Sequence, residues 1–170
     1  MNMQLVNSLE DSTWQSFVDQ NPYGNIYHTP QMFQVFAKSE KHKPTFWAVI
    51  DQSKHPLALL TPVEITLRNG LFFEWTTRAV AYGSVLNAPG PEGRAALQLL
   101  LKTYCSKMQG HILFTEFRNL FNLGEQQPTL NEEKFLLEDH LNYLIDLDQS
   151  EEMLWHNIDR RWHCQSCRSQ

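Results

Sequence analysis

The sequence predicts an α+β fold, with a mixed, largely antiparallel sheet flanked by helices. Two amphipathic segments precede the strand-like ones, and the turn pair Asn69-Gly70 joins two strand-like segments into a hairpin. A long amphipathic segment then separates this hairpin from the last strands. Helices set apart from hairpins in this way favour a mixed sheet over a doubly wound parallel one.

The first helix is expected to begin at Asp11 or Ser12, because either side chain can accept a hydrogen bond from the free backbone N–H groups of the first turn. Trp14, Phe17 and Val18 follow at spacings of three and four. Those spacings place the three side chains on one helical face, which predicts that the helix packs on the core through that face.

A second helix is expected after the break formed by residues 21–24. Thr29 is a suitable N-cap, and Pro30 suits the first helical position because its missing N–H would have no partner there. Phe33 and Phe36 then line one face. The sequence therefore predicts a helix that starts at Thr29-Pro30.

Strand character dominates the next segments. Residues 45–50 are aromatic and β-branched, and residues 57–68 alternate in a way that predicts a single strand. Because Pro62 cannot donate to a ladder, this strand is expected to lie at an edge or to carry a bulge there. The hairpin turn at Asn69-Gly70 predicts an antiparallel return through residues 71–76.

Residues 79–90 indicate a strand end and a loop, and a long helix is expected from about Pro91 to Gln109, closed by Gly110. One apolar stripe supports this helix: Leu97, Leu100, Leu101, Tyr104 and Met108. Residues 111–117 then predict another strand, and residues 123–131 a polar loop.

The last predicted elements are strand segments at 135–137 and 141–147, followed by a helix that begins at Ser150 with two acidic residues in its first turn. After Arg161 the periodicity ends. We therefore expect a domain over residues 1–161 and an irregular tail over residues 162–170.

Composition narrows the classes of function. The chain has 170 residues and a formal net charge of −5, so it is a poor general binder of DNA or anionic lipid. It has no apolar run long enough to span a membrane, and its first residues lack the features of a secretion signal. Three cysteines do not make a disulfide framework. These observations predict a cytoplasmic protein.

Three parts of the chain, taken in order, resemble the first half of the FemAB-like branch of the GNAT-type acyltransferases, which includes the peptidoglycan bridge-forming aminoacyltransferases. The resemblance covers nearly the whole chain up to Arg161. It is carried by residues 14–18 running into 24–30, by residues 78–84, and by residues 140–147 with 150–155 and the pair Arg160-Arg161.

The resemblance implies tandem GNAT-like folds that transfer an acyl group to an amine, with acyl-CoA or aminoacyl-tRNA as donor. The acceptor would be a small-molecule amine or a peptidoglycan precursor. This sequence lacks the second GNAT-like half, so we expect a truncated or frame-shifted chain with no cofactor of its own and little activity alone. The family's glycine-rich turn for pantetheine and pyrophosphate is also not evident in the sequence.

Two pairs of residues are candidates for substrate binding. Tyr27 and His28 precede a helix N-terminus and could line the acceptor cleft, although local packing explains His28 equally simply. Tyr82 and Gly83 end a strand where a ligand could approach the backbone closely, although a plain turn also accounts for the glycine.

The pair Arg160-Arg161 is the third candidate. These residues either form ordinary cations at a helix C-terminus or, by the resemblance, begin a basic segment that meets phosphate or a carboxylated peptide. Cys164 and Cys167, with Cys105 elsewhere, do not supply the ligands of a zinc site, so no metal is expected. No catalytic residue can be assigned from the sequence.

Two other functions remain open. The chain could be a non-catalytic interaction module, and apolar surface left exposed by a missing half would then favour self-association. It could also be a small, independent N-acetyltransferase that uses acetyl-CoA. Binding of CoA would distinguish the enzyme from the interaction module.

Overall fold

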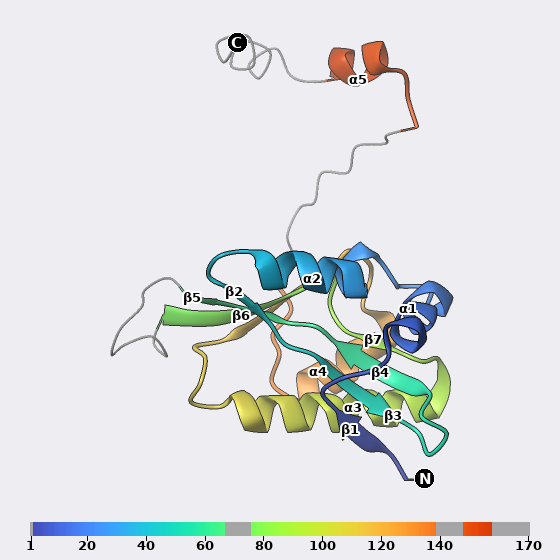
Figure 1. Cartoon of the computed structure of the whole chain (residues 1–170), viewed down its shortest axis with the longest axis vertical. Helices are drawn as coiled ribbons and strands as arrows, with labels where there is room; N and C mark the ends of the chain where they lie inside the picture. Colours follow the sequence, from blue (N-terminus) through green and yellow to red (C-terminus); the bar gives the residue numbers. More distant parts are fainter. Residues whose placement is uncertain (1, 67–75, 139–147, 158–170) are drawn as a thin grey trace. The chain divides into compact units, whose positions relative to one another are not determined.

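The computed structural model describes residues 2–66, 76–138 and 148–157 (Figure 1). The chain forms two compact units, Met1–Leu136 and Leu137–Gln170. The helices of the first unit are α1 (Asp11–Gln20), α2 (Pro30–Lys38), α3 (Gly90–Met108) and α4 (Gln127–Glu132), with short 3-10 helices η1 (Ile26–His28) and η3 (Gly124–Gln126). Its strands are β1 (Gln4–Val6), β2 (His42–Pro44), β3 (Trp47–Ile50), β4 (Pro56–Leu60), β5 (Val63–Thr66), β6 (Thr77–Tyr82), β7 (Leu86–Asn87) and β8 (Thr115–Arg118).

The strands form two four-stranded sheets, in the orders β1-β3-β4-β7 and β2-β5-β6-β8. The named strands pair in antiparallel fashion except β6 and β8, which are parallel. Figure 1 shows α1 and α2 on one side of the strands and α3 on the other. The predicted α+β fold with a mixed, largely antiparallel sheet is therefore confirmed.

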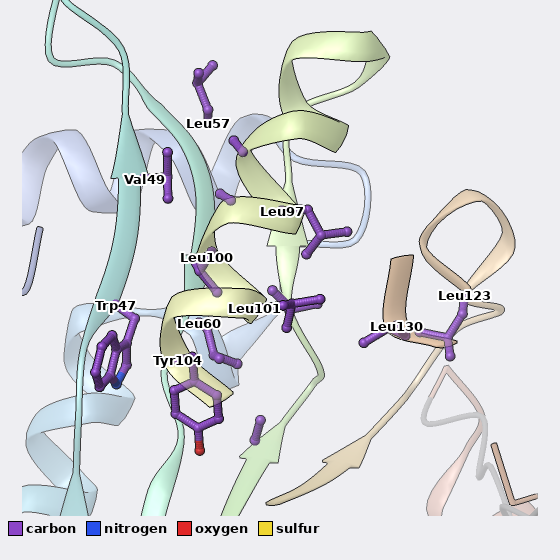
Figure 2. Packing of buried hydrophobic residues seen from close by; sticks show 14 residues of the cluster. Trp47, Val49, Leu57, Leu60, Leu97, Leu100, Leu101, Tyr104, Leu123 and Leu130 are labelled. Atoms are coloured by element: carbon purple, nitrogen blue, oxygen red, sulfur yellow. The ribbon is translucent and has the colours of Figure 1, made fainter. Parts of the chain in front are cut away.

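The core has one apolar layer on each side of the strands. Trp47 and Val49 of β3 pack with α3, whereas Ala48 packs with Trp14 and Val18 of α1. Figure 2 shows the α3 layer, in which the predicted stripe is buried at Leu97, Leu100, Leu101 and Tyr104. Met108, the last residue of the stripe, is partly buried against the same cluster. Burial of this stripe confirms the predicted long helix.

Both helix starts are confirmed, but the predicted cap of α1 is wrong. The Thr29 side chain accepts from the Met32 N–H, and Pro30 opens α2, as predicted. In α1, neither Asp11 nor Ser12 is the cap. Glu10 takes that position without a side-chain hydrogen bond, and its carbonyl accepts from Trp14 N. α1 thus begins at Asp11, and its cap lies one residue before the two predicted candidates.

The prediction of one strand over residues 57–68 is wrong. The chain divides at Thr61-Pro62, so that β4 lies in one sheet and β5 in the other. Pro62 lacks an N–H, and its carbonyl accepts from Thr45 N at 2.8 Å. Antiparallel pairing of the two chain segments resumes on both sides of the break, which means that the proline separates the sheets without shifting the register.

Later elements differ partly from expectation. The antiparallel return after β5 is confirmed in β6, while the predicted turn at Asn69-Gly70 and residues 71–75 lie outside the described residues. The segment 123–131 is helical and not a polar loop. Leu123 and Leu130 are buried in the core, so this segment packs against the rest of the unit.

Two further strand predictions concern residues 135–137 and 141–147. Residues 135–137 do not form a strand, and Phe135 instead stacks on Phe117 with a centroid distance of 4.5 Å. Residues 141–147 lie outside the described residues.

The second unit contributes one described helix, α5 (Glu151–Asn157), as predicted. The Ser150 hydroxyl accepts from the Met153 N–H at 3.3 Å, so Ser150 caps it. The predicted boundary at Arg161 lies outside the described residues and stays a prediction. No helix within the described ranges has the length and apolar character needed to cross a membrane.

Candidate functional site

A two-residue bulge interrupts the chain between β6 and β7. Val63 pairs with Val80 and Leu59 with Leu86. The four residue steps from Leu59 to Val63 therefore lie opposite six steps on the partner segment. The extra residues fall at Gly83 and Ser84, whose φ angles are +79° and +73°. We call residues Gly83–Val85 the β6–β7 bulge. It ends the pairing of β6 with β8 and directs β7 into the other sheet.

The bulge brings four of the predicted site residues together. His28 is completely buried, and a Cβ placed on Gly83 would lie only 2.8 Å from its Cε1 atom. Glycine is therefore required both by the positive φ and by the approach of the imidazole. The ring of Tyr27 stacks on that of Tyr82, with centroids 5.6 Å apart. Segments that lie far apart in the sequence thus form one site.

His28 acts structurally rather than as a base. Its Nε2 lies 3.4 Å from the Ser84 carbonyl, which can only accept, so this nitrogen carries the proton. Trp14 Nε1 donates to the His28 carbonyl at 2.6 Å. Burial lowers the pKa of the imidazole to about 4, while hydrogen bonds to the carbonyls of Ser84 and Gly83 partly oppose that effect. His28 is therefore neutral and holds the α1–α2 connection against the bulge.

We expect His28 to make stability pH-dependent. The unfolded imidazole has an ordinary pKa of 6.5 and the folded one about 4, so the unfolded chain binds more protons between these values. The contribution is complete above pH 6.5 and declines as the pH falls to 4, by about 3 kcal/mol in total. Chemical denaturation of wild type at several pH values measures this slope.

The matched variants are His28→Gln and His111→Gln, since His111 is exposed. The first is expected to remove most of the slope between pH 4 and 6.5, and the second to retain it. If His28→Gln does not fold, the NMR titration of the His28 ring in wild type supplies the midpoint directly. A midpoint near 6.5 would refute this account of the ring.

An aromatic and cationic surface adjoins the bulge. Tyr82 stacks with both Tyr27 and Phe36, and its ring centroid lies 5.3 Å from that of Phe36. The guanidinium carbon of Arg118, at the end of β8, lies 5.2 Å from the Tyr82 centroid. We call Tyr27, Phe36, Tyr82 and Arg118 the aromatic–arginine surface. The three ring side chains are partly exposed, and the Arg118 side chain is 47% exposed, so a ligand can reach it.

The backbone of the bulge is already hydrogen-bonded within the protein. Gly83 N donates to Arg118 O at 3.0 Å, and Ser84 N donates to Ala81 O at 3.3 Å. Gln126 of η3 is buried, and its Nε2 donates to Val85 O at 3.2 Å and to Asn87 Oδ1 at 2.8 Å. A ligand that used Val85 O would therefore have to replace the Gln126 amide.

Buried polar atoms without partners gather at the same place. Among the described residues, His28 Nδ1, Ser84 Oγ and Gln126 Oε1 have no hydrogen-bond partner. Leaving such groups unpaired costs about 1–3 kcal/mol each. The bulge region therefore contains buried polar atoms that form no hydrogen bond with the described residues.

Sequence reasoning missed Arg118 and Gln126. Arg118 is the last residue of a strand whose exposed positions carry no distinguishing motif, and Gln126 lies in the segment expected to be a polar loop. The predicted pair Arg160-Arg161, with Cys164 and Cys167, lies outside the described residues.

Two features of the first unit lie apart from these predictions. Cys105 is half-buried, and burial raises the pKa of its thiol. An open hollow at the C-terminal end of α3, lined by Met108, Ile112 and Phe135 among others, includes none of the predicted site residues. Within the described ranges, no group of three His, Cys, Asp or Glu side chains is placed to hold a metal ion.

Comparisons with known proteins yield a fold but no sequence relative. No protein-family model matches the chain, and no curated protein matches it. Solved structures do match. A transcriptional regulator from Bacillus halodurans C-125 aligns with a TM-score of 0.60 and 9% identity, over 85% of this chain and 100% of its own.

Two acetyltransferase structures match similarly. The aminoglycoside N-acetyltransferase AAC(6')-Iy in complex with CoA aligns with a TM-score of 0.56 and 7% identity, over 86% of this chain and 94% of its own. A predicted acetyltransferase with acetyl-CoA from Clostridium acetobutylicum gives 0.54 and 11%, over 87% and 99%. The expected GNAT-like fold is thereby confirmed, whereas identities this low show the fold alone.

Proposed function

We propose that this chain is a small N-acyltransferase that moves an acyl group from an acyl-CoA thioester to an amine. The observation that carries the proposal is the β6–β7 bulge, which follows the end of the parallel pairing of β6 with β8 and lies beside the aromatic–arginine surface. The acetyltransferase neighbours support it, because one holds CoA, another acetyl-CoA, and this chain spans nearly their whole length. A cytoplasmic location, as expected from the sequence, would supply the donor.

In the proposed reaction, the amine nitrogen attacks the thioester carbonyl carbon. A C–N bond forms, the C–S bond breaks, and the departing thiolate takes up the proton that the amine loses, so the products are an amide and free CoA thiol. Tyr27 and Tyr82 would position the acceptor at the bulge, which supplies catalysis mainly through orientation. His28 would not accept the proton, because burial of its ring lowers the pKa of the imidazole to about 4.

Gln126 provides a test of the donor side. A donor amide that hydrogen-bonds to Val85 O must displace the Gln126 side chain, whose bonds together are worth about 1 kcal/mol net. Calorimetric titration with acetyl-CoA should therefore show binding to wild type, and binding about fivefold tighter to Gln126→Ala. Gln98→Ala is the matched control, since exposed Gln98 bonds only to Glu132.

The proposal fails if acetyl-CoA binds neither wild type nor Gln126→Ala. Equal tightening by Gln98→Ala would reject the role of Gln126 while leaving donor binding intact.

A second candidate function is supported by a different observation. The amide groups of Gly83 and Ser84 are both used inside the protein, so the bulge offers few free donors for a coenzyme. This favours the FemAB-like proposal, in which the chain is the first half of an aminoacyl- or acyltransferase for peptidoglycan precursors and is inactive without a second lobe. Absence of CoA binding, with activity restored by such a lobe, would select it. A mass that rises with concentration in light scattering, without CoA binding, would select the interaction module.

A further inference from the structure

Three charged side chains form a row on one face of the sheet β2-β5-β6-β8. Val80 pairs with Glu116 and Tyr82 with Arg118, so Arg78, Glu116 and Arg118 share that face with Tyr82. Arg118 Nε donates to Glu116 Oε1 at 2.9 Å, and Arg78 Nη1 lies 3.8 Å from Glu116 Oε2. One carboxylate therefore serves two guanidinium groups, which leaves one positive charge uncompensated within this row.

Arg118 keeps the donors that matter for a ligand. Its Nε is committed to Glu116, but its terminal amino groups have no hydrogen-bond partner among the described residues. Arg78 Nε is also buried without a partner. The contact with Tyr82 holds the Arg118 guanidinium over one edge of the aromatic–arginine surface. A planar group with two free amino groups and a fixed orientation suits a carboxylate better than a neutral group.

We propose that Arg118 is the carboxylate anchor of the acceptor site, and that the acceptor is an amino acid or short peptide with a free carboxylate and an apolar or aromatic side chain. The inference rests on the proposed function. Arg118 would bind the carboxylate, and the Tyr27–Tyr82 stack would contact the side chain. The amine end of the same molecule would then extend toward the β6–β7 bulge. Arg118 acts here as a specificity-determining residue.

The test compares two probes that differ only in charge. Glycyl-tyrosine and glycyl-tyrosine amide are titrated into the full-length ¹⁵N-labelled protein, and affinities are read from backbone and arginine side-chain resonances. We expect the carboxylate form to bind about tenfold more tightly in wild type. Arg118→Gln should remove the difference. Arg118→Lys should leave about a threefold difference, because the charge remains without the two-pronged donor.

Arg94→Gln is the matched control, since Arg94 is an exposed arginine that pairs with Glu125 at 3.3 Å on another part of the unit. It should retain the tenfold difference. The proposal is overturned if the amide binds as tightly as the carboxylate, or if Arg118→Gln preserves the preference. It is also overturned if inorganic phosphate displaces glycyl-tyrosine at lower concentration than acetate does, which would indicate a phosphate site.

The titration uses no acyl donor, so its outcome is separable from that of the proposed function. A carboxylate preference that depends on Arg118 in a protein that binds no acetyl-CoA would reject the transferase alone. Acetyl-CoA binding without any carboxylate preference would reject only the acceptor class.

Discussion

Gly93→Ala is expected to lower the free energy of unfolding of the first unit by about 3 kcal/mol. A Cβ on Gly93 would overlap the carbonyl group of Ala88, which is backbone and cannot rotate away. Ala88 N also donates to Leu57 O at 2.8 Å, which fixes this turn to β4. The substitution must therefore open the connection between β7 and α3. Urea unfolding, followed through the fluorescence of Trp14 and Trp47, measures the loss.

Gly90→Ala is the control for Gly93→Ala. Gly90 has a φ of +86°, but no atom lies within 4 Å of a Cβ placed on it. Only backbone strain opposes alanine there, at a cost of about 1–2 kcal/mol. A loss at Gly93 no greater than at Gly90 would show that the turn adapts and that close backbone contact does not determine the stability of this connection.

Leu100→Ala is expected to cost about 3–4 kcal/mol of the same free energy of unfolding. Leu100 is completely buried in the layer between α3 and the strands, where Figure 2 shows it beside Leu60 and Leu101. Alanine would leave a cavity between a helix and two strands, and those elements cannot close it without disturbing their own hydrogen bonds. Urea unfolding at constant m-value measures the effect.

The neighbouring residue supplies the matched control. Leu99 is 37% exposed, so Leu99→Ala should change the free energy of unfolding by no more than about 0.5 kcal/mol. Equal losses at the two positions would mean that the buried stripe of α3 does not organise this core.

The two sides of the β6–β7 bulge differ in how many of their polar groups are already hydrogen-bonded within the protein. The side proposed for the acceptor presents partly exposed rings and an arginine with unused donors. On the donor side, Gln126 already bonds to the backbone at Val85. Under the proposed function, an acceptor would displace only solvent, whereas a donor that bonds to Val85 O would first displace the buried Gln126 side chain.

The site could be predicted only in part. The predicted helix N-terminus pointed to Tyr27 and His28, the strand-end glycine pointed to Tyr82 and Gly83, and the structure places these residues together. That His28 would be buried against Ser84, 56 positions away, could not be predicted, because contacts between distant segments depend on how the strands register. Arg118 was missed for the same reason, since its relation to Tyr82 exists only through strand pairing.

The sequence by itself determined most of the local structure. The period of the α3 stripe, the Thr29-Pro30 start of α2 and the Ser150 start of α5 all follow from interactions within one or two turns of chain. Only the tertiary structure decided where β4 gives way to β5 and where the extra residues of the bulge fall. Those features depend on which carbonyl meets which amide across strands, and residues near each other in the chain carry no record of that pairing.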